Sequence, residues 1–392
     1  MQRVERHIIL MDKNLDNLCF LSKNLYNYCN YLIRQEFTST GKILSEYELT
    51  GRLAKEQQLD YIALPAQTSQ QIIKLLFKNW KSFFKLCKCK DKLNGKPKLP
   101  KYKHKEKGRN IVVFTGQQCK LKNGYIHFPK KANIEPLKTK VENVCQVRII
   151  PQCSCHIIEV VYEKECIKTT ELEPDSYLSI DLGLNNLVTS CDSLNHKSFI
   201  VNGRVLKSIN QYFNKKKAYL MSLIGNRGMS KRIGKMTLKR NCKVNDYMHK
   251  ASRFIVNYCI EHHISTIVIG NNKDWKQNCN MGKRNNQNFV SIPFEKLISQ
   301  IQYKAEEVGV KVIVTEESYT SKTDHHAGEE MCHHDTYLGK RIKRGLFRSA
   351  TGKILNADLN GAIGILRKVI GESYMQVINR GEVATPLRIH IV

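Results

Sequence analysis

Two aspartates that are far apart in the sequence stand where a carboxylate could do chemistry. Asp181 follows the apolar run 177–180, where a buried strand should stop, and Gly183 then allows a tight turn into a second strand at 187–189. A carboxylate at the end of a buried strand is costly unless it is paired or holds a metal ion. The alternative is that Asp181 caps the turn by accepting hydrogen bonds from backbone N–H groups. This stretch alone leaves both interpretations open.

The second aspartate, Asp358, lies in the first turn of a helix that the pattern of residues 356–366 predicts. Ala362, Ile365 and Leu366 recur at helical spacing and form an apolar face. An aspartate at a helix N-terminus is ordinary, because it complements the free N–H groups and the helix dipole. The small residues at 357, 361, 362 and 364 are more informative, since they would let this helix approach a sheet closely.

The two aspartate motifs together resemble a known family. Asp-Leu-Gly at 181–183 and Asn-Ala-Asp-Leu-Asn-Gly-Ala at 356–362 look like the first and last acidic motifs of an RNase H-like RuvC nuclease. The version matched is that of the transposon-encoded TnpB (OrfB) family, which is related to type V CRISPR effectors. Five further stretches agree with this family and extend the resemblance to nearly the whole chain: 5–9, 21–27, 79–84, 318–322 and 339–347.

The resemblance implies a function and its partners. The chain would be encoded by an insertion sequence, bind a guide RNA from the transposon end, and recognise a short motif flanking a double-stranded DNA target. The RuvC site would then cut the DNA with two Mg²⁺ (or Mn²⁺) ions, one activating water and one stabilising the leaving oxygen. A nuclease-dead RNA-guided repressor is the second hypothesis, and a transposase that needs no guide is the third.

One acid of the RuvC set is missing from its usual place. Most relatives carry a glutamate at the end of the strand that here spans 266–269, where this chain has Gly270. The next strand, 311–315, ends in Glu316 and Glu317, and neighbouring strands lie about 4.8 Å apart, so an acid there could reach the same ions. We therefore predict Asp181, Asp358 and a relocated glutamate, Glu317 rather than Glu316, as the catalytic and metal-binding residues.

Two alternatives accompany that prediction. Successive residues of an extended chain point to opposite faces, so only one glutamate can face the aspartates, and Glu316 would pair with a basic helix instead. Both glutamates could also be simple ion-pair partners on a basic protein, and Asp274, in the loop after 266–270, is a poorer candidate for the third acid.

Members of this family often carry a four-cysteine zinc site after the Thr-Ser-Lys run. Here residues 323–326 read Thr-Asp-His-His and residues 332–334 read Cys-His-His, with no C-x-x-C pair among them. Structural zinc sites need closely paired ligands. We therefore expect a degenerate, metal-free insertion at about 321–350 rather than a structural zinc site.

The overall charge points to nucleic acid. The chain has 392 residues with 64 Lys and Arg against 35 Asp and Glu, a net charge of +29. Such an excess is self-repulsive unless a polyanion neutralises it, and the binding it drives should weaken steeply with salt. No signal peptide or membrane segment is visible, and we read most of the 14 cysteines as small buried residues of a reduced, cytoplasmic prokaryotic protein.

A basic loop at 88–110, punctuated by proline and glycine, is predicted to grip a nucleic-acid backbone because it interleaves aromatic and cationic side chains. Two long helices at 208–222 and 230–263 carry further cations. The predicted nucleic-acid-binding residues are Lys96, Lys98, Lys101, Tyr102, Lys103, Lys105, Lys231, Arg232, Lys340, Arg341 and Arg344.

The order of elements predicts a multidomain protein of the α/β and α+β classes. A first strand with Val4 and residues 7–10 in the core precedes helices at 13–38, 44–58 and 66–87, and strands fill 111–165. Together with the resemblance, this order implies a wedge β-barrel (1–15 and 88–167) with a helical recognition lobe inserted at 16–87, in which Trp80 is a core residue. After an acidic linker at 168–176, the RuvC domain would occupy 168–392.

Overall fold

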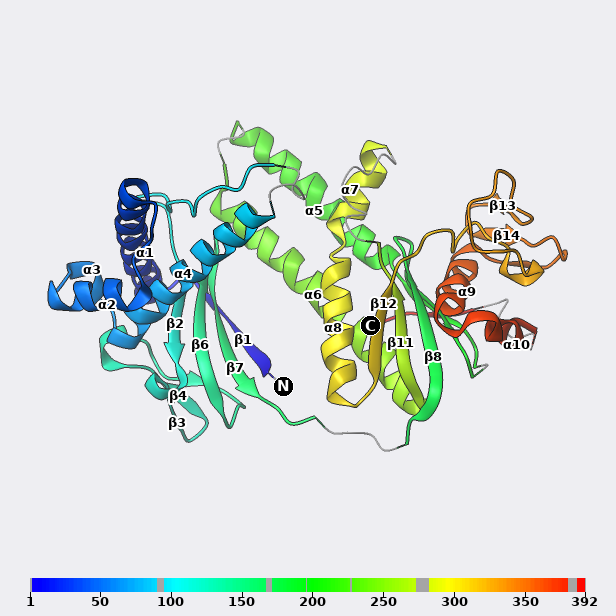
Figure 1. Cartoon of the computed structure of the whole chain (residues 1–392), viewed down its shortest axis with the longest axis horizontal. Helices are drawn as coiled ribbons and strands as arrows, with labels where there is room; N and C mark the ends of the chain where they lie inside the picture. Colours follow the sequence, from blue (N-terminus) through cyan, green and yellow to red (C-terminus); the bar gives the residue numbers. More distant parts are fainter. Residues whose placement is uncertain are drawn as a thin grey trace. The chain divides into compact units, whose positions relative to one another are not determined.

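The computed structural model describes residues 2–89, 95–166, 171–194, 196–225, 228–272, 282–379 and 386–391. The chain forms two compact units of mixed α and β structure, residues 1–164 and 165–392, each shown in Figure 1. Asp274 lies outside the described residues. None of the described helices is both long and apolar enough to cross a membrane.

The sheet of the first unit is antiparallel, in the order β1-β7-β6-β2. Its strands are β1 (Gln2–Leu10), β2 (Val112–Thr115), β6 (Val144–Pro151) and β7 (Cys155–Glu163). A smaller sheet contains β3 (Lys120–Lys122), β4 (Tyr125–His127) and β5 (Leu137–Lys138). Within the described strands, β1 and β2 are the two edges of an open sheet, so the predicted closure into a barrel is not seen. Val4 and Ile8 of the edge strand β1 are exposed, contrary to the prediction that they lie in the core.

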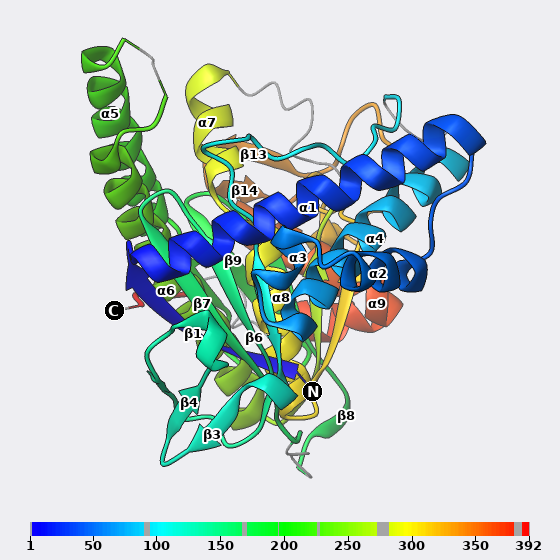
Figure 2. The same ribbon diagram turned by 90° about the vertical axis from the view of Figure 1, so that its left-hand side faces the viewer.

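Helices pack against part of this sheet, on β2 and β6. They are α1 (Lys13–Thr40), α2 (Glu46–Lys55), α3 (Leu59–Ile62) and α4 (Ala66–Lys88), seen in Figure 2. Asp12 caps α1, and Ser45 with Glu48 forms a capping box on α2. Both α1 and α4 pack on β2. Trp80 of α4 is fully buried, as predicted for a core residue, and its Nε1 donates to Asn30.

The second unit is built on a six-stranded sheet in the order β12-β11-β8-β9-β10-β16. Its strands are β8 (Glu173–Leu182), β9 (Asn186–Asp192), β10 (Phe199–Asn202), β11 (Ile264–Gly270), β12 (Lys311–Thr315) and β16 (Leu387–Ile389). Strands β8, β11 and β12 are parallel, whereas β9 is antiparallel to β8. The predicted neighbours 266–269 and 311–315 therefore do lie side by side. The predicted linker at 168–176 extends too far, because β8 already begins at Glu173. Within β8, the hydroxyl of Ser176 accepts a hydrogen bond from the N–H of Ser265 on β11.

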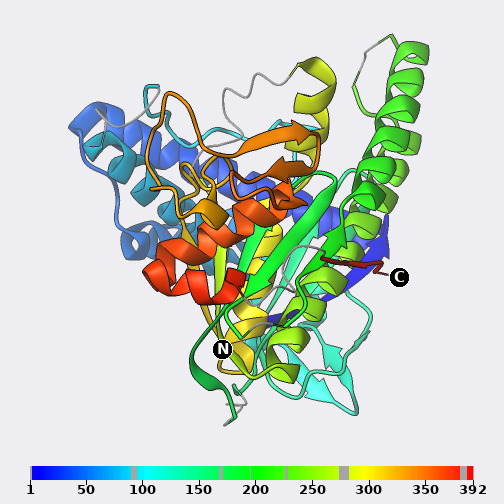
Figure 3. The same cartoon turned by 90° about the vertical axis from the view of Figure 1, so that its right-hand side faces the viewer.

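Helices lie on both faces of this sheet. They are α5 (Arg204–Leu223), α6 (Lys231–Glu261), α7 (Lys283–Ser291), α8 (Phe294–Glu307), α9 (Ala357–Ile370) and α10 (Tyr374–Asn379). Leu178 and Ile180 share a core with α6 and α8, while Ser179 donates to the carbonyl of Ala362 in α9. Because side chains alternate along a strand, Asp181 lies on the same face as Ser179, next to Gly361 of α9. Figure 3 shows α9 in front of this sheet.

The insertion between β12 and α9 contains a short 3₁₀ turn (His325–Ala327) and a three-stranded sheet. Its strands are β13 (Lys340–Lys343), β14 (Leu346–Arg348) and β15 (Ile354–Asn356). Among the cysteines that the structure describes, fewer than half are buried, namely Cys19, Cys29, Cys119, Cys155, Cys191 and Cys259. The prediction that most cysteines are buried is therefore wrong for the described part of the chain.

Candidate functional site

Helix α9 runs across the ends of the three parallel strands. A Cβ added at Gly361 would lie 3.0 Å from Asp181 of β8, and one added to Gly270 of β11 would lie 2.5 Å from Ile365. Lys368 reaches Glu316, which follows β12, at 2.9 Å. Residues 361, 365 and 368 share one face of a helix, and four residues advance it by about 6 Å, close to the spacing of strands. One helix face therefore meets β8, β11 and β12 in turn.

Strand register brings the candidate acids to one edge of the sheet. Ile269 pairs with Ile180, so Gly270 and Asp181 follow side by side, and Gly270 also pairs with Thr315. Glu317 comes two residues after Thr315 and so belongs to the same face in an extended chain. Asp358 is in the first turn of α9, and its carboxylate accepts a hydrogen bond from Asn186 at 2.7 Å.

The side chain of Glu317 occupies the space that a side chain at position 270 would need. A Cβ built on Gly270 would lie 2.6 Å from Oε1 and 2.7 Å from Cγ of Glu317, closer than real Cβ atoms approach other atoms. The glycine on β11 and the glutamate after β12 are thus complementary in shape. The carboxylate expected at the end of β11 is replaced, in the same space, by one that reaches in from the neighbouring strand.

Burial and neighbouring charges raise the pKa values of two of the candidate acids. The pKa of Asp181 is raised well above its usual range, first by burial and then by the charges of Glu317 and Asp358, with a smaller opposing effect of Arg341. Burial likewise raises the pKa of Glu317 to about 7, against the opposing effect of Lys368. Carboxylates that repel each other in a desolvated place favour either protons or a bound cation.

The donor chemistry fits a hard divalent cation. Mg²⁺ prefers carboxylate oxygens, and Oε1 of Glu317 is a buried oxygen for which the structure shows no hydrogen-bond partner. However, among the described residues no three His, Cys, Asp or Glu side chains converge closely enough to hold one ion. Asp181, Glu317 and Asp358 would therefore have to draw together around a cation.

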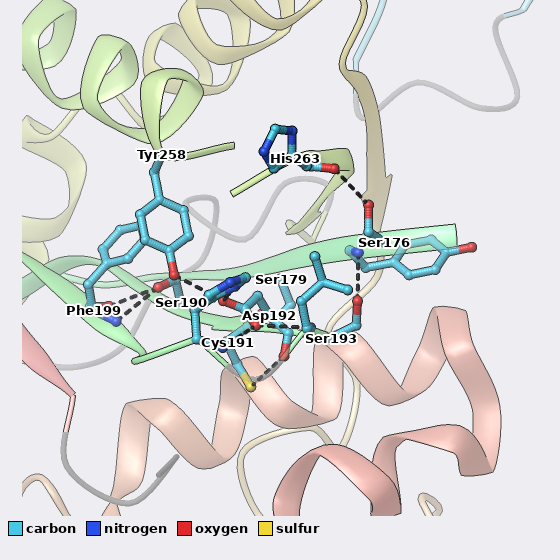
Figure 4. Close-up of polar contacts among 12 residues, drawn as sticks. Ser176, Ser179, Ser190, Cys191, Asp192, Ser193, Phe199, Tyr258 and His263 are labelled. Carbon is cyan, nitrogen blue, oxygen red and sulfur yellow. Dashed lines mark hydrogen bonds and ion pairs between the residues drawn. The ribbon is translucent and has the colours of Figure 1, made fainter. Parts of the chain in front are cut away.

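Buried carboxylates elsewhere in this sheet are satisfied, which makes Glu317 unusual. Asp192, at the end of β9, accepts hydrogen bonds from the Tyr258 hydroxyl at 2.9 Å and from the backbone N–H groups of Leu194 and His196. Figure 4 shows this network. Asp192 thus has the partners that a structural carboxylate needs, whereas Oε1 of Glu317 has none in the structure.

Three asparagines that sequence reasoning missed position the acids. Asn356 caps α9 by accepting from the N–H groups of Asp358 and Leu359, and Asn186 donates to the Asp358 carboxylate. The side chain of Asn272 accepts from the backbone N–H of Glu317 at 2.9 Å. Asn356 was within the recognised helix-start motif, but no sequence signal links Asn272 to Glu317, because 45 residues separate them.

Glu316 takes the role predicted for the second glutamate, since it pairs with Lys368 of the helix α9. This hydrogen bond lowers the pKa of Glu316. Glu316 and Glu317 are therefore in opposite electrostatic situations: Glu316 is exposed and paired, whereas Glu317 is half-buried, with its Oε1 buried and without a hydrogen-bond partner in the structure. The assignment of one of them to catalysis remains a prediction.

Some predicted nucleic-acid-binding residues of the second unit surround this region. Arg341 on β13 acts electrostatically on Asp181 and, with Lys322 and Tyr337, lines a cavity of about 340 Å³. Lys340 and Arg344 are exposed on the same hairpin. Lys231 and Arg232 are exposed at the start of α6, away from the insertion sheet in sequence, and Arg232 lines a different cavity beside α5.

The described part of the basic loop of the first unit, residues 95–110, lies along α1 and is hydrogen-bonded to it; we call this segment the strap. Asn27 holds the backbone of Lys103 through both its N–H and its carbonyl, at 2.8 and 2.9 Å, and Asn30 donates to the carbonyl of Pro100. The guanidinium of Arg34 lies 4.5 Å from the centre of the Tyr102 ring. The exposed cations at 96, 98, 101 and 105 are therefore carried by an ordered segment, while Lys103 is half-buried.

The insertion at 321–350 is held by a carboxylate network. Asp324 is fully buried and accepts from Ser349, the N–H of Ala350 and the N–H of Ala327. The N–H of Asp324 in turn donates to Glu329, which also accepts from the N–H of Leu338. These bonds join the start of the insertion at Asp324 to its later segments at Glu329, Leu338 and Ser349.

Two family models match separate parts of the chain. The OrfB_IS605 model, described as a probable transposase, matches residues 158–276, and the model of the Cas12f1-like TNB domain matches residues 294–365. The first range contains Asp181 and Gly270, and the second contains Glu317 and Asp358. The two matches therefore span all positions of the candidate site.

Two individual proteins are also similar in sequence to this chain. The TnpB-like protein ORF457 of Acidianus two-tailed virus is 25% identical over 411 residues, covering 92% of this chain and 84% of that protein. The CRISPR-associated endodeoxyribonuclease Cas12f1 of Sulfoacidibacillus thermotolerans is 32% identical over 158 residues, covering 38% of this chain and 34% of that protein.

The fold is also similar to a solved structure. A cryo-EM structure of a Cas12f1–sgRNA–target DNA complex superimposes with a TM-score of 0.56 at 15% identity, covering 90% of this chain and 81% of that chain. At this identity the similarity concerns the fold alone. The family models and these two proteins together show that the chain is similar to TnpB-like proteins over most of its length and to Cas12f1 over part of it.

Proposed function

We propose that this chain is an RNA-guided DNA endonuclease encoded by an insertion sequence. In this proposal it binds a guide RNA from the transposon end, recognises a short flanking DNA motif, and cuts double-stranded DNA with an RNase H-like RuvC domain. The first unit would act as the wedge and recognition lobe. The relationship to TnpB-like and Cas12f1 proteins and the net charge of +29 support this proposal.

The observation that carries the proposal is the fit of Glu317 into the space beside Gly270. A nuclease that had lost its second acid by chance would have no reason to bury an unpaired carboxylate there, because such burial costs free energy. In the proposed mechanism Asp181, Glu317 and Asp358 would hold Mg²⁺ (or Mn²⁺), and the bound ion would supply activation of a water molecule and neutralisation of phosphate charge. Asn186 and Asn356 hold Asp358 and the start of its helix, and Asn272 holds the backbone of Glu317.

The repressor hypothesis rests on a different observation. The three carboxylates do not converge to coordinating distance among the described residues, as would be expected of a protein that only binds DNA. In that case the protein would bind RNA and target DNA without cutting. A transposase that needs no guide has no specific observation in its favour.

The test starts from protein purified with the RNA that its native locus expresses. The complex is incubated with a plasmid library of randomised flanks, with Mg²⁺, with Mn²⁺ or with EDTA. We expect cleavage only with a divalent ion, abolished by Asp181→Ala, Asp358→Ala or Glu317→Gln while target binding remains. Glu316→Gln is the matched control and should still cut.

Two results would contradict this assignment. Target binding by the wild type without cleavage under any flank or ion would favour the repressor. Normal cleavage by the Glu317→Gln variant would place the third acid elsewhere, with Asp274 the next candidate.

A further inference from the structure

A second cavity lies in unit 2, between helices α5 and α6, and the carboxylates do not contribute to it. It has a volume of about 750 Å³, within the range of roughly 300–1,000 Å³ of pockets that hold small organic ligands. We call it the α5–α6 groove; its lining residues that matter here are Tyr212, Tyr219, Arg232, Lys235, Lys239 and Lys243. Figures 1 and 2 show the two helices.

The groove is unlike the seam of an ordinary helix pair. Residues 232, 235, 239 and 243 lie three or four apart on α6, so their cationic side chains form one stripe along the helix. No Asp or Glu lines the groove, and none occurs anywhere in the sequence from 204 to 245. Like charges at this spacing destabilise a helix unless an anion lies among them. The charge of the α5–α6 groove therefore favours an anionic ligand.

Two aromatic rings are exposed beside this stripe. Tyr212 and Tyr219 of α5 have 65% and 59% of their surface accessible. A phosphate needs only cations, so exposed rings at a cationic groove indicate a ligand that also has flat apolar faces. Unpaired bases have such faces and stack on aromatic side chains, whereas the bases of a duplex are already stacked on each other.

We propose that the α5–α6 groove binds a single strand of DNA, with bases stacked on Tyr212 and Tyr219 and phosphates paired with the stripe on α6. DNA rather than RNA is proposed because the Ser208 end of the groove lies next to the turn after Asp181, where the proposed function places DNA cleavage. The inference extends the proposed function by giving the DNA substrate a second contact, outside the carboxylate site.

The position of α5 connects the groove with the carboxylates. The N–H of Gly203, directly before α5, donates to the carbonyl of Asn185 at 2.8 Å, in the turn that follows Asp181. Ser208, the first lining residue, is four positions into the helix, about 6 Å along its axis. The Ser208 end of the groove therefore lies close to the turn that follows Asp181.

Binding is tested on the full chain purified with its RNA, with a short fluorescent oligothymidylate as the probe and EDTA present so that no cleavage intervenes. The Tyr212→Ala and Tyr219→Ala variants should each weaken binding by about 5- to 150-fold, because each removes a ring on which a base stacks. Tyr212→Phe keeps the ring and should bind as the wild type does. Tyr47→Ala, which removes an 89% exposed tyrosine of unit 1, is the matched control.

Two further measurements make the proposal falsifiable. A probe that contains iododeoxyuridine should crosslink to the peptides of Tyr212 or Tyr219, and Lys235→Gln should reduce the salt slope of binding by about 0.7. Unchanged affinity of the double alanine variant overturns the proposal, and so does tighter groove-dependent binding of oligouridylate or duplex DNA. Because no readout needs cleavage, failure here is distinct from failure of the endonuclease assignment.

Discussion

At the scale of single residues, the site depends on Gly270 remaining a glycine. Any Cβ at this position would lie within 2.7 Å of atoms of Glu317 and Ile365. Gly270→Ala should therefore displace the Glu317 carboxylate and reduce cleavage at least tenfold, with a stability cost of about 1–3 kcal/mol from overpacking. Plasmid cleavage and thermal melting measure the two effects.

Controls for this variant exist within the chain. Gly51→Ala on α2 meets nothing within 4 Å and should leave cleavage unchanged, with stability raised by up to about 1 kcal/mol. Exchange of the two side chains, Gly270→Glu with Glu317→Gly, returns the acid to β11 and should restore part of the activity. Full activity of Gly270→Ala alone would contradict the claim that Glu317 and position 270 share one space.

The pKa of Glu317 predicts how stability depends on pH. Because its pKa is raised from 4.5 to about 7 in the folded protein, folding favours the protonated form, and this stabilisation is complete below pH 4.5 and lost as the pH rises to about 7. Without divalent ions the wild type should lose on the order of 1–3 kcal/mol between pH 5 and 8 from this group. Glu317→Gln should show a flatter profile in chemical denaturation.

Added Mg²⁺ gives the complementary measurement. A cation binds the ionised carboxylates, so it should raise the melting temperature more at pH 8 than at pH 5. Equal stabilisation at both pH values, or the same pH profile in the wild type and Glu317→Gln, would show that Glu317 does not titrate in this way.

At the scale of elements, sequence reasoning succeeded where each element carries its own signal. The strands at 266–270 and 311–315 are continuous apolar runs, and a parallel pair separated by a helix follows from their order. The reach of Glu317 toward Asp181 was therefore predictable in outline. The fit of Glu317 against Gly270 was not, because it depends on where α9 crosses the strands, which no local pattern specifies.

The open sheet of unit 1 shows the opposite case. Alternating strands at 111–165 were compatible with a barrel or with a sheet covered by helices, and periodicity does not distinguish them. Long-range contacts distinguish an open sheet from a barrel, and here α1 and α4 pack on β2. In the same unit, the strap along α1 depends on Asn27 and Asn30, whose spacing gives no signal of a partner 70 or more residues away.

The contacts of the strap predict how well ordered its cationic residues are. Asn27→Ala removes both hydrogen bonds to the backbone of Lys103, so residues 98–110 should exchange amide hydrogens faster and guide RNA should bind several-fold more weakly. Asn14→Ala, an exposed position on the same helix, should change neither. Unaltered exchange in the Asn27 variant would mean that the strap is held by other contacts.

The insertion should fold without zinc. Asp324 is a buried acceptor of three hydrogen bonds, and removing a charged acceptor of this kind costs about 2–4 kcal/mol. Asp324→Ala should thus expose residues 321–350 to limited proteolysis, whereas Asp335→Ala, on the surface of the same insertion, should not. Chelators should leave the wild type resistant, and stoichiometric zinc in metal analysis would contradict the prediction.

At the scale of the whole molecule, the net charge of +29 decides the conditions under which the protein is stable. No folded arrangement of 64 cations and 35 anions can pair them all, so at low salt the free protein repels itself. The strap in unit 1, the hairpin of β13 and β14, and the α5–α6 groove each concentrate cations with few acids nearby. Each is stabilised when a polyanion neutralises it.

This distribution of charge predicts that the affinity for RNA depends strongly on salt, and that each cationic region contributes a separate part of that dependence. The affinity for RNA should fall by about 10³–10⁵ between 50 and 200 mM salt if six to ten phosphates are neutralised, and the free protein should melt at a higher temperature when heparin is added. Replacing Lys98 and Lys101 of the strap with Gln should lower the salt slope by about 0.7–0.9 for each phosphate that the variant no longer neutralises. Lys55→Gln on α2, outside these three regions, is the control and should leave the slope unchanged. A shallow slope in the wild type, with RNA still bound tightly in high salt, would mean that base-specific contacts rather than the cationic regions hold the RNA.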